Sequence, residues 1–160
     1  MSEDLAPLQK LEKNLMSLDI TRLRQYQDQI ENLTHGANTM NAPMYLRDFI
    51  LAYDEANNLL ARATRYLGQA DSALKMAESM AYFENAPEYL EKHSVKDSSE
   101  ARKRYVPLDP HVQDAERVKS LAESMVQFLK NKMMEFRLAH DDVKKIAYAN
   151  DNNNSPYEGM

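Results

Sequence analysis

Cysteine and tryptophan are absent from this sequence of 160 residues, and glycine occurs only 3 times. A chain without cysteine forms no disulfide and offers no thiolate metal site, which is typical of a reducing compartment. No apolar run approaches the roughly 18 residues that a membrane-spanning helix needs. The N-terminus, MSEDLAPLQK, is acidic, unlike a secretory signal. We therefore expect a soluble, cytoplasmic protein without a membrane partner.

Motifs for catalysis and for metal binding are also lacking. The sequence has no glycine-rich phosphate loop and no GxSxG nucleophile motif. No histidine lies three or four residues from another histidine, as metal-binding helices require; the four are His35, His93, His111 and His140. The run from His140 to Asp142 is better interpreted as a solvated helix end than as a weak metal site. We predict a protein that is not an enzyme and has no cofactor and no metal.

What the sequence does contain is a long apolar pattern over residues 45–83. Apolar residues recur there in steps of three and four without interruption: Leu46, Phe49, Tyr53, Ala56, Leu60, Ala63, Leu67, Ala70, Leu74, Ala77 and Ala81. This spacing predicts one long helix with a coiled-coil seam. Alanine in many of the seam positions lets a second helix approach closely. We expect this helix to end between Phe83 and Pro87, because the residue before a proline avoids helical geometry. The following PEYLEKHS can form one more short turn.

A second long helix is predicted over residues 110–147. Its stripe has the same spacing, and Asp109-Pro110 is a good start signal, a capping residue followed by proline in the first turn. The two long helices have similar lengths and a similar mix of small and large seam residues. We therefore predict an all-α fold, a long antiparallel helical hairpin with an alanine and leucine seam and one or two shorter N-terminal helices.

The apolar stripe of the first long helix is wider than a two-helix contact needs, so we expect a third helix or another subunit to cover its flank. The residues predicted to serve oligomer or helix packing are Ala52, Leu59, Tyr66, Ala73, Met80, Phe136 and Val143.

The N-terminal segment, residues 1–34, has two short leucine-rich stripes that change register between Leu18 and Leu23. Asp19 or Thr21 is a candidate cap for a second helix there, and one continuous helix with a stutter is the alternative. Residues 34–43 are predicted to form a loop. The predicted organisation is an N-terminal segment 1–34, a hairpin 35–148 whose connector is 84–109, and a polar, disordered tail 149–160.

Basic residues gather in the second half of the sequence. Residues 92–145 carry 12 Lys and Arg against 9 Asp and Glu, or +3, and the rest carries 8 against 16, or −8. Within the connector, Asp97 or Ser98 is expected to cap a short helix that contains the run ARKRY. Cations beside a tyrosine suit a single strand, whose phosphates meet Lys and Arg while a base stacks on the ring. The candidate DNA-binding residues are Lys92, Lys96, Arg102, Lys103, Arg104, Tyr105, Lys130, Lys132 and Arg137. The alternative is a solvated helix face, paired with nearby carboxylates.

The order of these elements resembles the UvsY-like recombination mediators of tailed phages. The similar parts are a leucine-striped segment interrupted at LDITRL, YDEANN opening a long helix, a charged connector with a tyrosine, and a last amphipathic helix ending in HDDVKKI. Members of that family are helical proteins that assemble into rings, bind single-stranded DNA and load a recombinase onto it. The resemblance implies a homo-oligomer that partners single-stranded DNA and a recombinase or another replication protein, in the host cell cytoplasm if phage-encoded.

Our first hypothesis is therefore a non-enzymatic accessory protein of DNA recombination or replication. Several connectors presented around a ring would add weak contacts through multivalency. The second hypothesis is a structural or adaptor protein that acts only through protein–protein contacts. A third is a regulator that uses its acidic N-terminal part against a basic partner.

Overall fold

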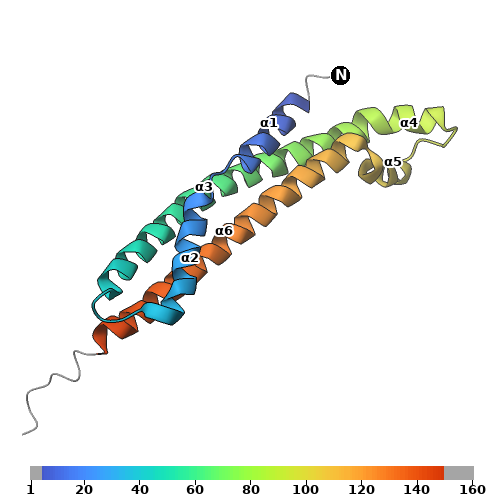
Figure 1. Ribbon diagram of the computed structural model, residues 1–160. Coiled ribbons are helices and arrows are strands. Elements are labelled where there is room, and N and C mark those ends of the chain that lie inside the picture. The colour runs from blue at the N-terminus through green and yellow to red at the C-terminus, as the bar shows by residue number, and fades with distance from the viewer. Residues whose placement is uncertain (1–4, 150–160) are drawn as a thin grey trace, which may run out of the picture. The chain divides into compact units, whose positions relative to one another are not determined.

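The computed structural model describes residues 5–149 (Figure 1). Every regular element in this range is helical, and the two long helices pack antiparallel, which confirms the predicted all-α hairpin. The long helices are α3 (Ala42–Met80) and α6 (Pro110–Tyr148), and the N-terminal helices are α1 (Leu5–Met16) and α2 (Thr21–Gly36). None of the described helices is both long enough and apolar enough to cross a membrane. The predicted tail, 149–160, lies outside the described residues except for Ala149.

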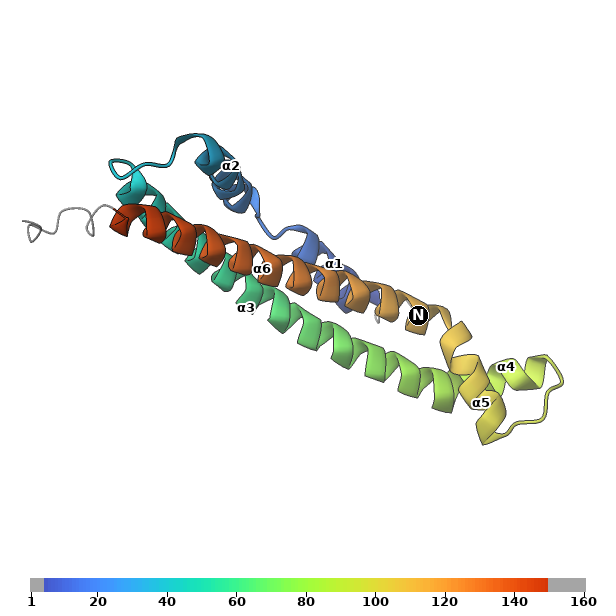
Figure 2. The same cartoon turned by 90° about the horizontal axis from the view of Figure 1, so that it is seen from below.

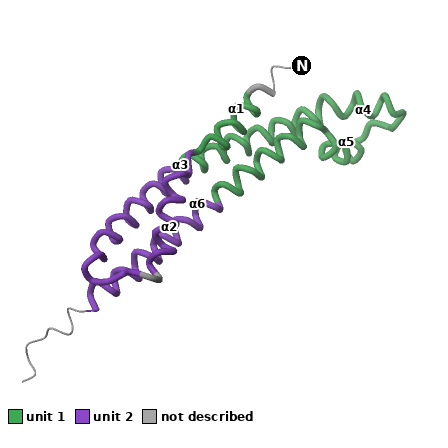
Figure 3. Tube along the Cα trace, viewed as in Figure 1, with its two compact units in different colours: residues 1–18, 62–126 green, residues 19–61, 127–160 purple. Residues whose placement is uncertain are grey.

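The chain divides into two compact units, and both long helices run through both of them (Figure 3). Unit 1 contains residues 1–18 and 62–126, and unit 2 contains residues 19–61 and 127–160. Each unit therefore joins one N-terminal helix to part of α3 and part of α6. This division follows contacts between segments that are distant in sequence, whereas the predicted organisation followed the order of the chain.

In unit 1, α1 packs on both long helices. Its Leu11 and Leu15 are buried in one cluster with alanine and valine side chains of α3 and α6, namely Ala70, Val118 and Ala122. The Arg117 guanidinium also binds the Glu12 carboxylate at 2.5 Å, from α6 to α1. The small alanine side chains let the helices approach closely, as the seam pattern predicted.

In unit 2, α2 takes the place that α1 has in unit 1. Tyr26 meets Phe136 of α6 edge to face, with ring centroids 6.2 Å apart, and Gln29 Nε2 donates to Asp48 of α3 at 3.3 Å. The break between the N-terminal helices is confirmed, and the continuous helix is wrong. Asp19 Oδ1 accepts the Thr21 N–H at 2.9 Å, so its carboxylate binds a first-turn donor that has no partner within the helix.

The first long helix does not end where the sequence predicted. After α3, the chain continues without a break as a π-helical turn, η1 (Ala81–Asn85), and then as α4 (Ala86–Lys92). Pro87 lies in the first turn of α4. In a regular α-helix its ring would clash with the carbonyl four residues earlier. The wider π-turn directly before the proline relieves this conflict, and π-turns of this kind are frequent at functional sites.

A candidate nucleic-acid interface in the connector

The connector (residues 84–109) turns the chain from α4 back to α6 within unit 1. It contains the short helix α5 (Ser99–Tyr105) and a single 3-10 turn, η2 (Val106–Leu108). Figure 2 shows α4 and α5 side by side at this turn. Ser98 caps α5 as predicted, because its hydroxyl accepts the Ala101 N–H at 3.2 Å.

Asp109 anchors the connector to the start of α6. Its side chain is 1% exposed and is the one buried charged group in the described part of the chain. Oδ1 accepts the N–H of His111 at 2.9 Å and that of Val112 at 3.4 Å, which confirms the predicted helix start. Oδ2 accepts from Asn85 Nδ2 at 2.9 Å and from the Tyr105 hydroxyl at 3.1 Å. The π-turn, α5 and α6 are thus joined at one carboxylate.

The pKa values of this group follow from these contacts. Burial acts to raise the pKa of Asp109, but the hydrogen bonds from Asn85, the backbone and Tyr105 outweigh it, so the pKa lies below the ordinary value. Burial, together with the hydrogen bond to Asp109, raises the pKa of Tyr105 to about 12. Tyr105 therefore stays a neutral hydrogen-bond donor at any physiological pH.

Three aromatic rings lie in contact on the connector. Tyr89 of α4 stacks on His93 with ring centroids 4.1 Å apart, and it lies 4.7 Å from the ring of Tyr105. Tyr89 as a residue remains 39% exposed, so this group of rings lies at the surface of the connector. Sequence reasoning included Tyr105 but missed Tyr89, although its four-residue spacing from His93 on a helix was a signal for this contact.

A pocket of about 390 Å³ opens between α4 and α5. Its lining combines aromatic, apolar and charged side chains: Tyr89, Leu90, Val95, Lys96, Ser98, Glu100, Ala101, Arg104, Tyr105 and Leu108. We call it the connector pocket. Of the predicted DNA-binding residues, it brings together Lys96, Arg104 and Tyr105. Such a mixture of an aromatic wall and cations suits a ligand that joins a planar ring to an anionic group.

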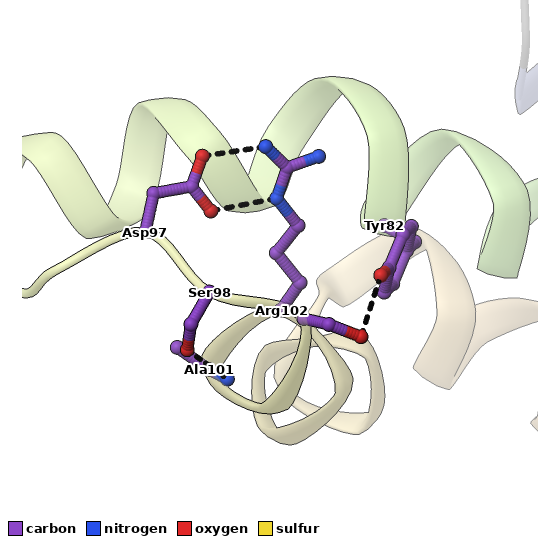
Figure 4. Close-up of polar contacts among 6 residues, drawn as sticks. Tyr82, Asp97, Ser98, Ala101 and Arg102 are labelled. Atoms are coloured by element: carbon purple, nitrogen blue, oxygen red, sulfur yellow. Dashed lines mark hydrogen bonds and ion pairs between the residues drawn. The ribbon is translucent and has the colours of Figure 1, made fainter.

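The basic residues of the connector differ in how they are engaged. Lys92, Lys96 and Lys103 are exposed and form no ion pair among the described residues. The Arg102 guanidinium binds the Asp97 carboxylate at 2.6 Å and 2.5 Å (Figure 4), and this holds the pKa of Asp97 low and raises that of Arg102. Arg104 binds Glu100 at 2.5 Å. The free positive charge of the connector is therefore on its lysines.

The remaining candidate cations belong to unit 2, apart from the connector residues of unit 1. Lys132 is half-buried, and its ammonium binds Glu135 at 2.7 Å and Gln27 at 2.9 Å. Lys130 and Arg137 are exposed. Lys132 thus has a role in holding α2 against α6.

The predicted packing residues lie at or near the interior of their own units. Ala52, Leu59, Phe136 and Val143 are buried, and Tyr66 packs against the Leu11 cluster of unit 1. Ala73 and Met80 are half-buried.

No group of three metal-ligating side chains occurs in the described range 5–149. Comparisons of the chain with protein-family models, with curated proteins and with solved structures found no match.

Proposed function

We propose that the protein is a non-enzymatic accessory factor of DNA recombination or replication that binds single-stranded DNA through its connector. The observation that carries this proposal is the combination of the partly exposed Tyr89, the open connector pocket that it lines and three unpaired lysines. Stacking on an aromatic ring is tolerant of sequence because every base has a π-face. Lysine ammonium groups without a carboxylate partner are available to phosphates.

Weak contacts of one connector would add up in a homo-oligomer. The affinity of a multivalent assembly exceeds that of each contact when its geometry permits simultaneous binding. Recruitment of a recombinase or another replication protein belongs to the same proposal. The resemblance in the order of elements supports it.

The test is fluorescence anisotropy of labelled oligo-dT at low and moderate salt. We expect the triple variant Lys92→Ala, Lys96→Ala, Lys103→Ala to bind more weakly. It should also reduce the slope of log K against log salt by about 2, since each phosphate contact on a single strand contributes about 0.7. The matched control is Lys10→Ala, Lys13→Ala, Arg65→Ala, three exposed basic residues of the same unit outside the connector.

A contribution of stacking is tested separately. Tyr89→Ala should weaken binding at all salt concentrations, while Tyr89→Phe keeps the ring and should restore it. No binding of oligo-dT at low salt would refute the proposed function, and equal loss in both triple variants would refute the connector as its site.

A second candidate is an adaptor that acts only through protein contacts. It is favoured by large apolar side chains that unit 2 leaves exposed, among them Met44, Ile50, Leu51, Met134 and Leu138. Exposed apolar side chains mark protein interaction sites where they form one contiguous patch. Light scattering of the wild type and of Leu138→Glu tests it. A shift of the variant to lower mass would assign Leu138 to a self-association contact. A wild-type monomer at high micromolar concentration would refute a ring.

A further inference from the structure

Arg102 and Arg104 lie two residues apart, but carboxylates hold them in different ways. Arg102 is built into the fold: its two bonds to Asp97 close the loop before α5, and its side chain is only 26% exposed. Its guanidinium also lies 5.7 Å from the ring centroid of Tyr82, whose hydroxyl donates to Ser99 Oγ at 3.0 Å (Figure 4). Removing this arginine would therefore disturb the loop itself.

The contact between Arg104 and Glu100 is of another kind. It is a single ion pair one helical turn apart, and its side chains are 79% and 74% exposed. Pairs of this kind contribute little to stability in water and exchange readily with solvent. Both residues line the connector pocket. A ligand in the pocket can thus reach Arg104 without any cost to the packing of the connector.

We propose that the connector pocket takes one nucleotide unit of the strand, and that Glu100 occupies the place of its phosphate on Arg104. On binding, the phosphate displaces the Glu100 carboxylate from the guanidinium while the base stacks on Tyr89. Glu100 is then an internal competitor that sets the affinity of the site. This inference rests on the proposed binding of single-stranded DNA.

The chemistry of the pocket fits such a unit. Its volume of about 390 Å³ falls in the usual range of small-molecule sites, about 300–1,000 Å³. Tyr89, Val95 and Leu108 supply an aromatic and apolar wall, and Lys96 supplies a second cation. The planar guanidinium of an arginine binds phosphate through two parallel hydrogen bonds, a geometry that a carboxylate also satisfies. Glu100 makes one hydrogen bond to Arg104, so a phosphate that replaces it can make the same bond and a second one beside it.

The experiment compares Glu100→Gln with Glu91→Gln, using anisotropy of labelled oligo-dT at low salt. Both changes remove one negative charge from the connector, and Glu91 is exposed on α4 without an ion pair in the described range. We expect Glu100→Gln to tighten binding about two- to fivefold, the factor that corresponds to loss of an exposed ion pair, and Glu91→Gln to change it much less. In an Arg104→Ala background, Glu100→Gln should change binding no more than Glu91→Gln does.

Each other outcome overturns the inference. An equal gain for both glutamine variants would mean that only overall charge matters, and a gain that persists without Arg104 would mean that Glu100 acts elsewhere. If inorganic phosphate displaced oligo-dT as well as thymidine monophosphate does, the pocket would be an anion site and not a nucleotide site. Binding by the wild type without a specific gain refutes this inference alone, whereas no binding by the wild type or by Glu100→Gln refutes the proposed function as well.

Discussion

The Asn85 amide donates to the Asp109 carboxylate across 2.9 Å, so the π-turn that follows α3 is tied to the first residue before α6. This contact closes the helical hairpin at its turn. It holds the beginning of the connector against its end, since Asn85 and Asp109 lie 24 residues apart in the sequence. The Tyr105 hydroxyl donates to the same oxygen, which connects the aromatic wall of the connector pocket to the hairpin.

The change Asp109→Asn tests this junction. An asparagine oxygen can still cap α6, but its amide would face the donors of Asn85 and Tyr105. We expect the free energy of unfolding to fall by about 1–3 kcal/mol, the cost of leaving a buried donor without an acceptor. Urea unfolding followed by circular dichroism measures it. Asp114→Asn, on an exposed position of α6, is the control and should have little effect.

The same carboxylate predicts an acid dependence of stability. Its folded pKa lies below the ordinary aspartate value of 3.8. The stabilisation is therefore complete above about pH 3.8 and is lost as pH falls through the lower, folded pKa. The difference in unfolding free energy between wild type and Asp109→Asn should shrink over this range. A difference that stays constant down to pH 2 would show that ionisation of Asp109 contributes nothing.

The hydrogen bond of Tyr105 is expected to make the stability of the protein depend on pH in the alkaline range. Burial, with the hydrogen bond to Asp109, raises the pKa of Tyr105 to about 12. A raised pKa contributes stability that is complete below the ordinary value near 10 and is lost as pH rises through 12. Absorbance at alkaline pH should show one late-titrating tyrosine in the wild type and none of it in Tyr105→Phe. Titration of all tyrosines together near pH 10 would contradict the hydrogen bond.

The sequence predicted those parts of the fold that depend on local pattern. The three- and four-residue spacing located both long helices, and the caps at Ser98 and Asp109 are local signals with a direct physical basis. The continuation of the first helix through Pro87 could not be predicted in this way. The helix passes through a π-turn whose Asn85 binds the distant carboxylate of Asp109, and neither feature has a signal in the sequence near the proline.

The candidate site was harder to predict than the fold. From the run ARKRY we expected its basic residues to be equally available for DNA, because a sequence shows charges but not the carboxylates that bind them. In the structure Arg102 is bound by a carboxylate from the preceding loop, and Arg104 by one from the preceding turn of its own helix. The pocket could not be predicted because its lining comes from both α4 and α5. These helices come together only through the turn of the chain between them.

The close contact of the long helices predicts a strong effect of side-chain size on the seam. Ala63 is fully buried, whereas Ala61 on the same helix is exposed. We expect Ala63→Leu to destabilise the protein by about 1–3 kcal/mol, because extra methylene groups in a packed core force neighbours apart. Ala61→Leu should be nearly neutral. Thermal unfolding of the two variants checks this, and equal midpoints would mean that the alanine seam is not a tight contact.

Replacement of Gly68 by alanine is expected to raise the stability of the protein. Gly68 lies at an exposed position inside α3, and a Cβ added there would meet nothing within 4 Å. Alanine in the middle of a helix is about 0.5–1 kcal/mol more favourable than glycine, because glycine loses more backbone freedom on folding. Gly68→Ala should therefore raise the unfolding midpoint, and the reverse change at a comparable position, Ala61→Gly, should lower it by a similar amount. Since residues 61 and 68 both lie outside the connector, binding of oligo-dT should be the same in both variants. A loss of stability in Gly68→Ala would mean that another chain covers this face of α3.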